Sequence, residues 1–393
     1  MNIISHPRSI TLLLSSTLTV MAGAIIAPAL PEISRIYGHL PNAELLSKLI
    51  LTLPALFIGL LAPVAGYVID LSGRRKVLLW SLALYAISGT TGAYLDNIYL
   101  ILVGRAFLGM SVGALMTAVI TLAGDYFEGA DRSRFMGFQA AFASTGGLLF
   151  ISTGGIMADM HWRFPFLIYG VSLLIMLMAF RYVNEVDIIR SAGQRRVFSR
   201  DLFRQIPRQI WWVYAIAFFS FAVFYMIPVQ MPFMLNAIEG TSSTQIGISI
   251  ALMNVTAMAT AFGYARIKRN LHFTQIMALV YFLVALGYIL ISLSNSYAMM
   301  TVSILVCGLG FGMQMANINL WLVQMAPAQI RGTLVGYLNA FIFLGMFLSP
   351  ILLQPLIVLT SLYQSFLGVA LILLVIATIL LASYGKGFWK YEA

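Results

Sequence analysis

The chain has 393 residues, of which 61% are hydrophobic and only 9% are charged. Soluble domains carry about a quarter charged residues, and a water-soluble fold of this length cannot hide so much apolar surface. The composition therefore excludes an ordinary soluble protein and indicates one that folds in lipid. The formal net charge of +10 also raises the possibility of nucleic-acid binding, which the distribution of basic residues argues against.

Long apolar runs predict an all-α membrane protein. A transmembrane helix needs about 20 mostly apolar residues, and the runs lack the alternation of apolar and polar residues that barrel strands show. A helix also satisfies its own backbone hydrogen bonds in lipid. We predict twelve transmembrane helices, at residues 9–30, 45–69, 76–95, 98–124, 134–157, 164–183, 209–235, 244–264, 273–294, 297–325, 331–357 and 361–384.

The basic residues indicate the orientation of these helices. If the N-terminus is cytoplasmic, most of the 23 Lys and Arg residues fall in loops on the inner side, the exceptions being Arg35, Lys48, Arg105 and Arg163. Positive charge is retained on the cytoplasmic side, so we expect both termini there. Since topology explains the charge, no nucleic-acid partner is expected. The first run is too long for a signal peptide and lacks a convincing cleavage site, so we expect it to be the first helix.

One long polar segment divides the predicted helices six and six. We predict an N-terminal bundle at residues 1–183, a cytoplasmic linker at 184–208 and a C-terminal bundle at 209–393. The basic, amphipathic linker suits either the surface of the inner leaflet or a solvated tether.

The two predicted bundles show traces of an internal repeat. An offset of 199 residues aligns Gly109 with Gly308, Gly113 with Gly312, Arg132 with Arg331, Gly137 with Gly336, Ala141 with Ala340, Phe142 with Phe341 and Gly146 with Gly345. Two parallel, pseudo-symmetric halves predict a substrate site near the membrane midplane between them.

The stretch "GYVIDLSGRRK", residues 66–76, interrupts the apolar chain between the second and third helices. Gly73 permits a tight reversal, the basic residues that follow favour the inner side, and the carboxylate of Asp70 is costly near the membrane unless it is paired. The stretch resembles the helix 2–3 signature of the major facilitator superfamily, which it matches at Gly66, Asp70, Gly73, Arg74, Arg75 and Lys76.

This resemblance implies a cytoplasmic gate. In the family, the acid and the arginines lock the two halves together in the outward-open state, and an acid at the inner end of the fourth helix joins them. Asp125 in "AGDYF" is the matching residue here. The corresponding loop of the second half, "GYARIKRNLHF", keeps Gly263 and basic residues but lacks the acid.

Three further stretches resemble the twelve-helix drug:proton antiporter branch of that family. The first helix ends "MAGAIIAPALPEI", and the fourth reads "RAFLGMSVGA", similar to a buried-arginine motif that the branch links to proton transfer. Its Arg105 lies roughly 10 Å into the helix at 1.5 Å per residue, where it acts on proton transfer or binds carbonyls structurally. The fifth helix keeps Gly154-Gly155 of the branch motif but has Phe150-Ile151 where Gly-Pro belongs, and Ser349-Pro350 stands at the offset position.

The carboxylates restrict how protons can be coupled to transport. None of the 13 Asp and Glu residues lies near a predicted helix centre, which argues against a strong preference for organic cations. Arginine stays protonated at physiological pH, so Arg105 can only tune a neighbour or orient water. We therefore expect Asp70 and Asp125 to carry the proton, with Arg105 assisting.

Polar residues inside the predicted helices are the candidates for substrate binding. They are Gln139 in the first half and Tyr225, Gln230, Asn254, Gln314, Asn317, Trp321 and Asn339 in the second. Gln314, Asn317 and Trp321 recur at i, i+3 and i+7 and so share one helix face. That face is either a wall of the substrate site or a source of hydrogen bonds between helices.

No catalytic or metal-binding constellation is evident, so we expect no cofactor, no metal and no enzymatic activity. The single cysteine, Cys307, allows no disulfide within the chain, and "GMSVG" at 109–113 lies in an apolar helix rather than on a hydrolase turn. The expected partners are a small-molecule substrate, protons and the lipid bilayer, for a chain that acts as a monomer.

The leading hypothesis is a proton-coupled exporter of small amphipathic molecules in a bacterial plasma membrane. The alternatives are a carrier of one metabolite or metallophore, which includes an anion anchored by Arg105, an uncoupled facilitator, or a non-transporting membrane receptor.

Overall fold

The computed structural model describes residues 6–185, 206–238, 240–327 and 330–385, without the side chains of Ala62, Pro63, Asp70, Ala130 and Ser133. Every regular element in this part of the chain is a helix. Twelve helical segments are long and apolar enough to cross a membrane, which confirms the predicted fold class. The predicted linker lies almost wholly outside the described residues, so the domain boundaries stay a prediction.

Six of the twelve spans precede the linker. They are formed by α1 (Pro7–Ala24) with η2 (Ala27–Ala29) and α2 (Leu30–Ile36), α3 (Ala43–Ser72), α4 (Arg74–Gly89) with α5 (Thr91–Tyr94), α6 (Ile98–Tyr126), α7 (Gly129–Met160), and α8 (Phe164–Leu167) with η3 (Ile168–Gly170) and α9 (Val171–Tyr182). The other six are α11 (Arg208–Asn236), α12 (Ser243–Asn270), α13 (Phe273–Ser292), α14 (Tyr297–Met325), α15 (Arg331–Leu359) and α16 (Leu362–Gly385).

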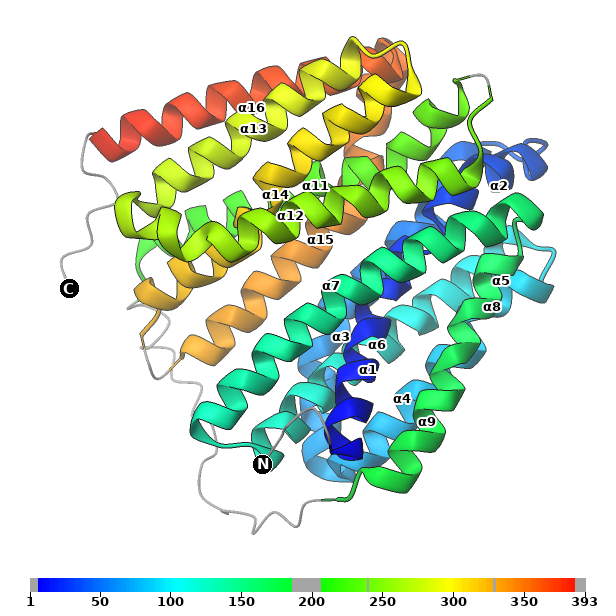
Figure 1. The fold of residues 1–393 in the computed structure, drawn as a ribbon, viewed down its shortest axis with the longest axis vertical. Coiled ribbons are helices and arrows are strands. Elements are labelled where there is room, and N and C mark those ends of the chain that lie inside the picture. Colours follow the sequence, from blue (N-terminus) through cyan, green and yellow to red (C-terminus); the bar gives the residue numbers. More distant parts are fainter. Residues whose placement is uncertain (1–5, 186–205, 239, 328–329, 386–393) are drawn as a thin grey trace.

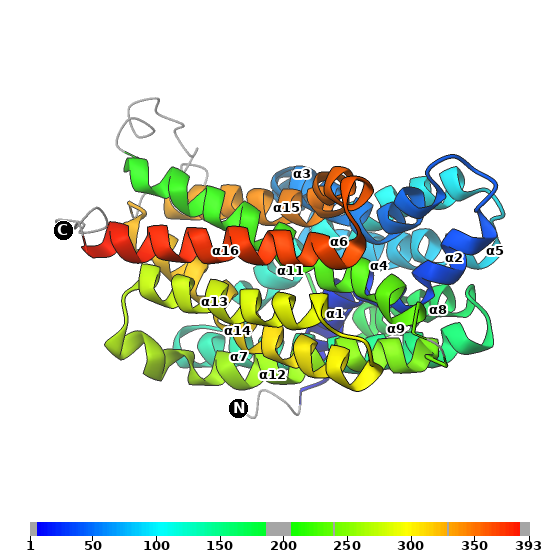
Figure 2. The same ribbon diagram turned by 90° about the horizontal axis from the view of Figure 1, so that it is seen from above.

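The helices of each half pack mainly on one another, and two helix pairs join the halves. Within the second half, α16, α13, α14 and α12 are successive neighbours (Figures 1 and 2). The pairs α3–α15 and α7–α12 form the main contacts between the halves. In Figure 1, α1 and α9 reach the bottom of the view, whereas α13 and α16 reach its left side, so the halves diverge from the upper right.

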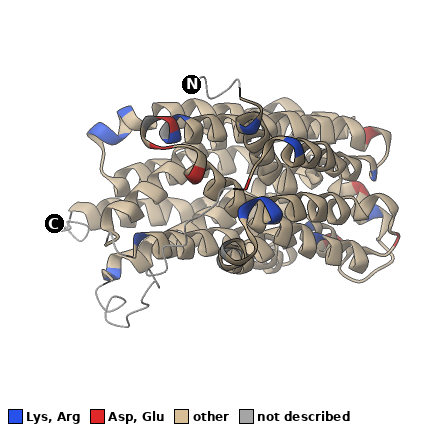
Figure 3. Ribbon diagram, turned by 90° about the horizontal axis from the view of Figure 1, so that it is seen from below, with Lys and Arg blue, Asp and Glu red and all other residues tan. Residues whose placement is uncertain are grey.

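The charged residues mark the two ends of the bundle. Lys, Arg, Asp and Glu are sparse on an otherwise uncharged ribbon (Figure 3). We call the end that carries Gly73, between α3 and α4, the basic end, and the end that carries the last turn of α7 the Asp159 end. Consecutive spans cross between these two ends, so residues distant in sequence meet at each of them.

The first span is broken where it reaches the middle of the bundle. Pro28 lacks a backbone N–H and its ring disfavours helical geometry before it, and α1 accordingly stops at Ala24 before the short helix η2. Tyr169 of η3 donates a hydrogen bond to the carbonyl of Ala22 at 3.0 Å, and Tyr85 of α4 donates to that of Leu18 at 2.7 Å. The carbonyl of Ala22 is among the last four of α1, which lack an intrahelical donor, so Tyr169 supplies a hydrogen bond that the break leaves open.

Candidate functional site

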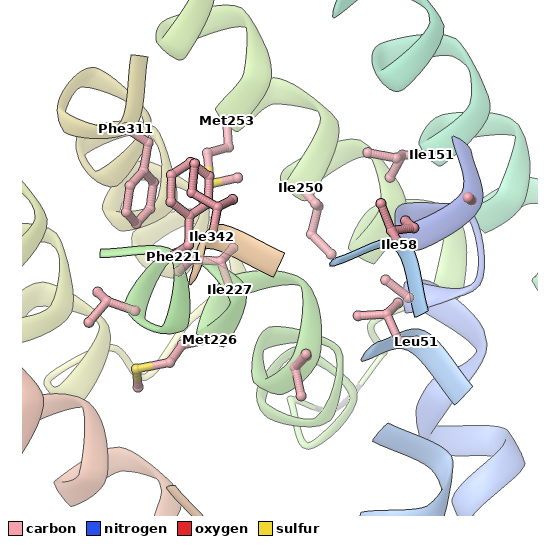
Figure 4. Packing of buried hydrophobic residues seen from close by; sticks show 14 of the residues in the cluster. Leu51, Ile58, Ile151, Phe221, Met226, Ile227, Ile250, Met253, Phe311 and Ile342 are labelled. Carbon is pink, nitrogen blue, oxygen red and sulfur yellow. The ribbon is translucent and has the colours of Figure 1, made fainter. Parts of the chain in front are cut away.

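A cavity of about 260 Å³ lies between the two halves. In Figure 4, Ile250 on α12 points toward Leu51 and Ile58 of α3, across the space that separates the halves. None of the described residues that line the cavity is charged. They are Thr19, Val20, Ala22, Gly23, Ala24, Leu51, Pro54, Ala55, Ile58, Met116, Ile151, Phe224, Tyr225, Pro228, Ile250, Met253, Asn254, Phe343 and Met346.

Three polar side chains reach this apolar space. Thr19 donates its hydroxyl to a carbonyl of its own helix, so its hydrogen atom is already used. Asn254 makes one long bond, 3.4 Å from its side-chain nitrogen to the carbonyl of Ile250. A Cβ on residue 23 would lie only 2.5 Å from the hydroxyl oxygen of Tyr225. Glycine at this position therefore makes room for the phenol. A ligand in the cavity therefore meets one phenol, one amide and the hydroxyl oxygen of Thr19, which can still accept a hydrogen bond.

The other predicted binding residues lie outside the lining. Gln230, Gln314, Asn317 and Trp321 are buried. Asn339 and Gln139 are partly buried. Asn317 donates to the carbonyl of Phe273 at 3.0 Å and accepts from the hydroxyl of Tyr264 at 3.2 Å. The ring of Trp321 stacks on that of Phe273, with 5.9 Å between centroids. Asn317 and Trp321 therefore serve helix packing, whereas Tyr225 and Asn254 line the cavity.

Cysteine labelling separates the two roles. In a Cys307→Ser background, we expect Asn254→Cys to react with a small polar maleimide and substrate to slow that reaction. Asn317→Cys is expected to react at least tenfold more slowly, because Asn317 is fully buried. Equal labelling of the two variants in nanodiscs, measured by mass spectrometry, would instead make the face of Asn317 part of the pathway.

Arg105 lies in the first half behind the wall of the cavity. It is 0% exposed, and its described partners are the aromatic side chains of Tyr169 and Phe166 rather than a carboxylate. Its guanidinium carbon lies 4.7 Å from the ring centroid of Tyr169 and 4.8 Å from that of Phe166. Cation–π contacts of this kind stabilise a buried cation partly, but no described carboxylate pairs with it. Tyr169 thus contacts Arg105 with its ring and the end of α1 with its hydroxyl.

At the basic end, predicted gate residues of the first half contact one another and Glu185, at the start of the predicted linker. Arg74 Nε lies 2.6 Å from Asp125 Oδ2, an ion pair between α4 and α6. Glu185 accepts hydrogen bonds from the backbone N–H groups of Arg74 and Arg75, at 2.7 and 3.1 Å. The carboxylate of Glu185 thereby caps the N-terminus of α4, where negative charge is favoured. The side chain of Asp70 lies outside the described atoms, so its part in the gate stays a prediction.

Gly73 is required by both its backbone and its surroundings. Its φ is +94° and its ψ is 148°, a conformation that essentially only glycine adopts. A Cβ there would also lie 3.0 Å from the carboxylate atoms of Glu185. We expect Gly73→Ala to destabilise the purified protein by about 1–3 kcal/mol, seen as earlier thermal unfolding in detergent. Gly263→Ala is the control, because a Cβ at Gly263 meets nothing within 4 Å; equal unfolding temperatures would contradict this account.

At the Asp159 end, one carboxylate joins the two halves. Asp159 near the end of α7 accepts hydrogen bonds from the backbone N–H groups of Ser243 and Thr244, at 2.6 and 3.0 Å. Ser242 and Gln245 form a capping box at the same helix N-terminus, so Asp159 binds the two N–H groups that the box leaves free. Asp159 also adds negative charge at the positive end of the helix dipole.

Two glycines bring α7 and α12 into backbone contact beside Asp159. A Cβ on Gly155 would lie 2.6 Å from the carbonyl oxygen of Ser243, and one on Gly247 would lie 2.8 Å from that of Ile151. Gly154, on the adjacent position of α7, gives similar room to the break in α1, since its Cβ would lie 2.2 Å from the carbonyl oxygen of Ile25. Of the glycine pair retained from the antiporter motif, Gly154 therefore lets α7 approach the end of α1, and Gly155 lets α7 approach α12.

A buried lysine adds to the contacts at this end. The side chain of Lys48 is 0% exposed and pairs with Glu44 one turn earlier on α3. Its ammonium lies 5.0 Å from the ring centroid of Phe233 on α11, in the other half.

The family model of the Major Facilitator Superfamily matches residues 12–350. The chain belongs to the major facilitator superfamily. It is therefore an integral membrane secondary transporter rather than an enzyme.

Relatives within the superfamily include exporters and resistance proteins. The chain is 22% identical over 357 residues to the bacillibactin exporter of Bacillus subtilis (strain 168), covering 86% of this chain and 87% of the relative. It is 26% identical over 364 residues to the tetracycline resistance protein, class C, of Escherichia coli, covering 88% and 89%.

Solved structures show the same fold. A bacterial homologue of the human lysosomal transporter Spinster, in an inward-facing and occupied conformation, superposes with a TM-score of 0.78 at 15% identity, covering 98% of both chains. A D-xylose–proton symporter superposes with a TM-score of 0.75 at 15% identity, covering 95% of this chain and 96% of the other.

Four residues that form or support the sites described above were not predicted from the sequence. Asp159, Glu185 and Tyr169 act on backbone groups of other helices, which leave no side-chain signature at the partner position. Thr19 lines the cavity from α1. One available signal was the pattern Ser-x-x-Gln at residues 242–245, which is typical of a helix N-terminus and marks where a carboxylate from another helix can bind.

Proposed function

We propose that this transporter exports small amphipathic organic molecules in exchange for protons, by alternating access. The observation that carries the proposal is the cavity between the halves, together with the contacts that join the halves at one end. Asp159, Gly155 and Gly247 link α7 to α12 on that side of the cavity. At the basic end, the gate residues with described side chains pair within the first half. Such an arrangement fits a conformation that opens toward the basic end.

We infer that the basic end faces the cytoplasm, because loops rich in Lys and Arg are retained there. Figure 1 places the start of α1 and the end of α16 away from the Asp159 end, which fits two cytoplasmic termini. Export then starts with substrate entering the cavity from the cytoplasm or the inner leaflet.

Proton coupling is assigned to the gate, with Asp125 and Asp70 as the proton-carrying groups and Arg105 as an assisting residue. Asp125 is partly buried and paired with Arg74. The proton affinity of a carboxylate depends on nearby charge and on burial, and both change when a gate opens or closes. The efflux relatives at 22–26% identity support export without fixing the coupling.

A second candidate is export of one anionic metabolite or metallophore. It is favoured by the buried positive charge of Arg105, which pairs with no described carboxylate, and by the similarity to a bacillibactin exporter.

Proteoliposome transport distinguishes these candidates. We expect accumulation of uncharged amphipathic probes only when a pH gradient is imposed, and no response to anionic metallophores. Flux that follows the substrate gradient alone would make the protein a facilitator, and selective uptake of the metallophore would favour the second candidate.

A further inference from the structure

Two charged side chains are fully buried among the described residues, and only one of them is paired. Lys48 has Glu44 as its partner, whereas Arg105 has two aromatic rings and no described carboxylate. A charge in a region of low dielectric constant acts over a longer distance than one in water. The unpaired guanidinium of Arg105 therefore adds positive potential to the cavity region in front of it.

The end of α1 could in principle attract a cation, because the last carbonyls of a helix carry partial negative charge. In this structure, a protein side chain already binds one of those carbonyls. The carbonyl of Ala22 accepts a hydrogen bond from Tyr169, whose ring lies against Arg105. The protein thus supplies a donor to the end of α1 that lines the cavity, and the guanidinium of Arg105 lies against the ring of that donor.

The wall of the cavity gives a charged ligand no direct partner either. None of its described lining residues is acidic or basic, and moving a charge out of water without a partner is costly. The polar side-chain groups of the lining are the hydroxyl of Tyr225, the amide of Asn254 and the hydroxyl oxygen of Thr19, and each can bind an uncharged polar atom.

We propose that this cavity selects uncharged molecules with an apolar body and one hydrogen-bonding end, and rejects organic cations of the same shape. The polar end lies at Tyr225 and Asn254, and the apolar body packs on the aliphatic, Met and Phe side chains. This inference rests on the proposed function, since it specifies the class of molecule that the exporter takes.

Two phenols of matched shape, together with a third phenol that is anionic, test the selectivity. 4-tert-Butylphenol and (4-hydroxyphenyl)trimethylammonium differ in a single central atom and in charge, and 4-hydroxybenzoate supplies the anion. Binding is measured by equilibrium dialysis against nanodiscs with the protein, and empty nanodiscs correct for partition into lipid. We expect the wild-type protein to bind the uncharged phenol at least tenfold more tightly than either charged one.

Variants test the physical cause. Asn254→Asp places a carboxylate in the cavity and is expected to raise affinity for the ammonium compound at least tenfold, whereas Asn270→Asp, at the far end of the same helix, leaves it unchanged. Arg105→Met is expected to raise cation affinity as well; if that variant fails to fold, Asn254→Asp still decides.

The outcomes separate this inference from the proposed function. Equal affinity of the wild-type protein for the uncharged and cationic phenols would overturn the selectivity, even if a pH gradient drives export. Preference for the uncharged phenol without any response of transport to a pH gradient would uphold the selectivity and overturn the coupling. Tightest binding of 4-hydroxybenzoate would replace the inference with an anion site at Arg105.

Discussion

Asp125→Asn is expected to abolish the response of transport to a pH gradient while leaving substrate exchange measurable. The amide keeps the shape of the carboxylate but cannot gain and lose a proton, and it leaves Arg74 without its ion pair at the basic end. We expect uptake driven by a pH gradient to fall at least tenfold in proteoliposomes. Exchange of labelled for unlabelled substrate, which needs no net proton movement, should stay within about threefold of wild type.

Asp131→Asn is the matched control for this experiment. Asp131 lies at the same end of the bundle, and its pair with Arg134 is long, at 3.8 Å, and exposed. Exposed pairs of this kind contribute little, so the control should transport normally. A wild-type response of Asp125→Asn to the gradient would remove Asp125 from the coupling and leave Asp70 as the carboxylate to test.

Gly155→Ala is expected to lower transport at least tenfold by preventing closure at the Asp159 end. The added Cβ would lie 2.6 Å from the carbonyl oxygen of Ser243 and 3.1 Å from the Cα of Thr244. Backbone atoms cannot rotate away as a flexible side chain can, so α7 and α12 must separate. The equilibrium should then shift toward a state that opens at this end.

Gly137→Ala on the same helix is the control, because a Cβ at Gly137 meets nothing within 4 Å. Distances between spin labels on the ends of α7 and α12 measure the population of the closed state directly. If Gly155→Ala transports normally and its label distances match those of Gly137→Ala, close glycine packing is not what closes this end.

The sequence predicts the fold more completely than it predicts the site. Apolar length is a property of each segment alone, so all twelve spans were found, and proline in the first run explains why α1 breaks. A binding wall depends on which neighbour a helix face meets. Gln314, Asn317 and Trp321 do share a face, but Asn317 and Trp321 face α13, through Phe273, rather than the cavity. Asp159 looks like any acid at a helix end, because its partners are backbone N–H groups more than 80 residues away.

The hydrogen bonds between Asp159 on α7 and the N-terminus of α12 imply that the two helices tolerate substitution unequally at this contact. On α12 the donors are backbone N–H groups, which every residue except proline possesses. Ser243 and Thr244 can therefore vary through most amino acids without loss of the two backbone hydrogen bonds, and only Ser243→Pro or Thr244→Pro removes a backbone donor. On α7 the acceptor is a single side chain, so nearly every change at Asp159 removes both bonds. In a library of all single substitutions selected for export, position 159 should accept few residues and positions 243 and 244 many.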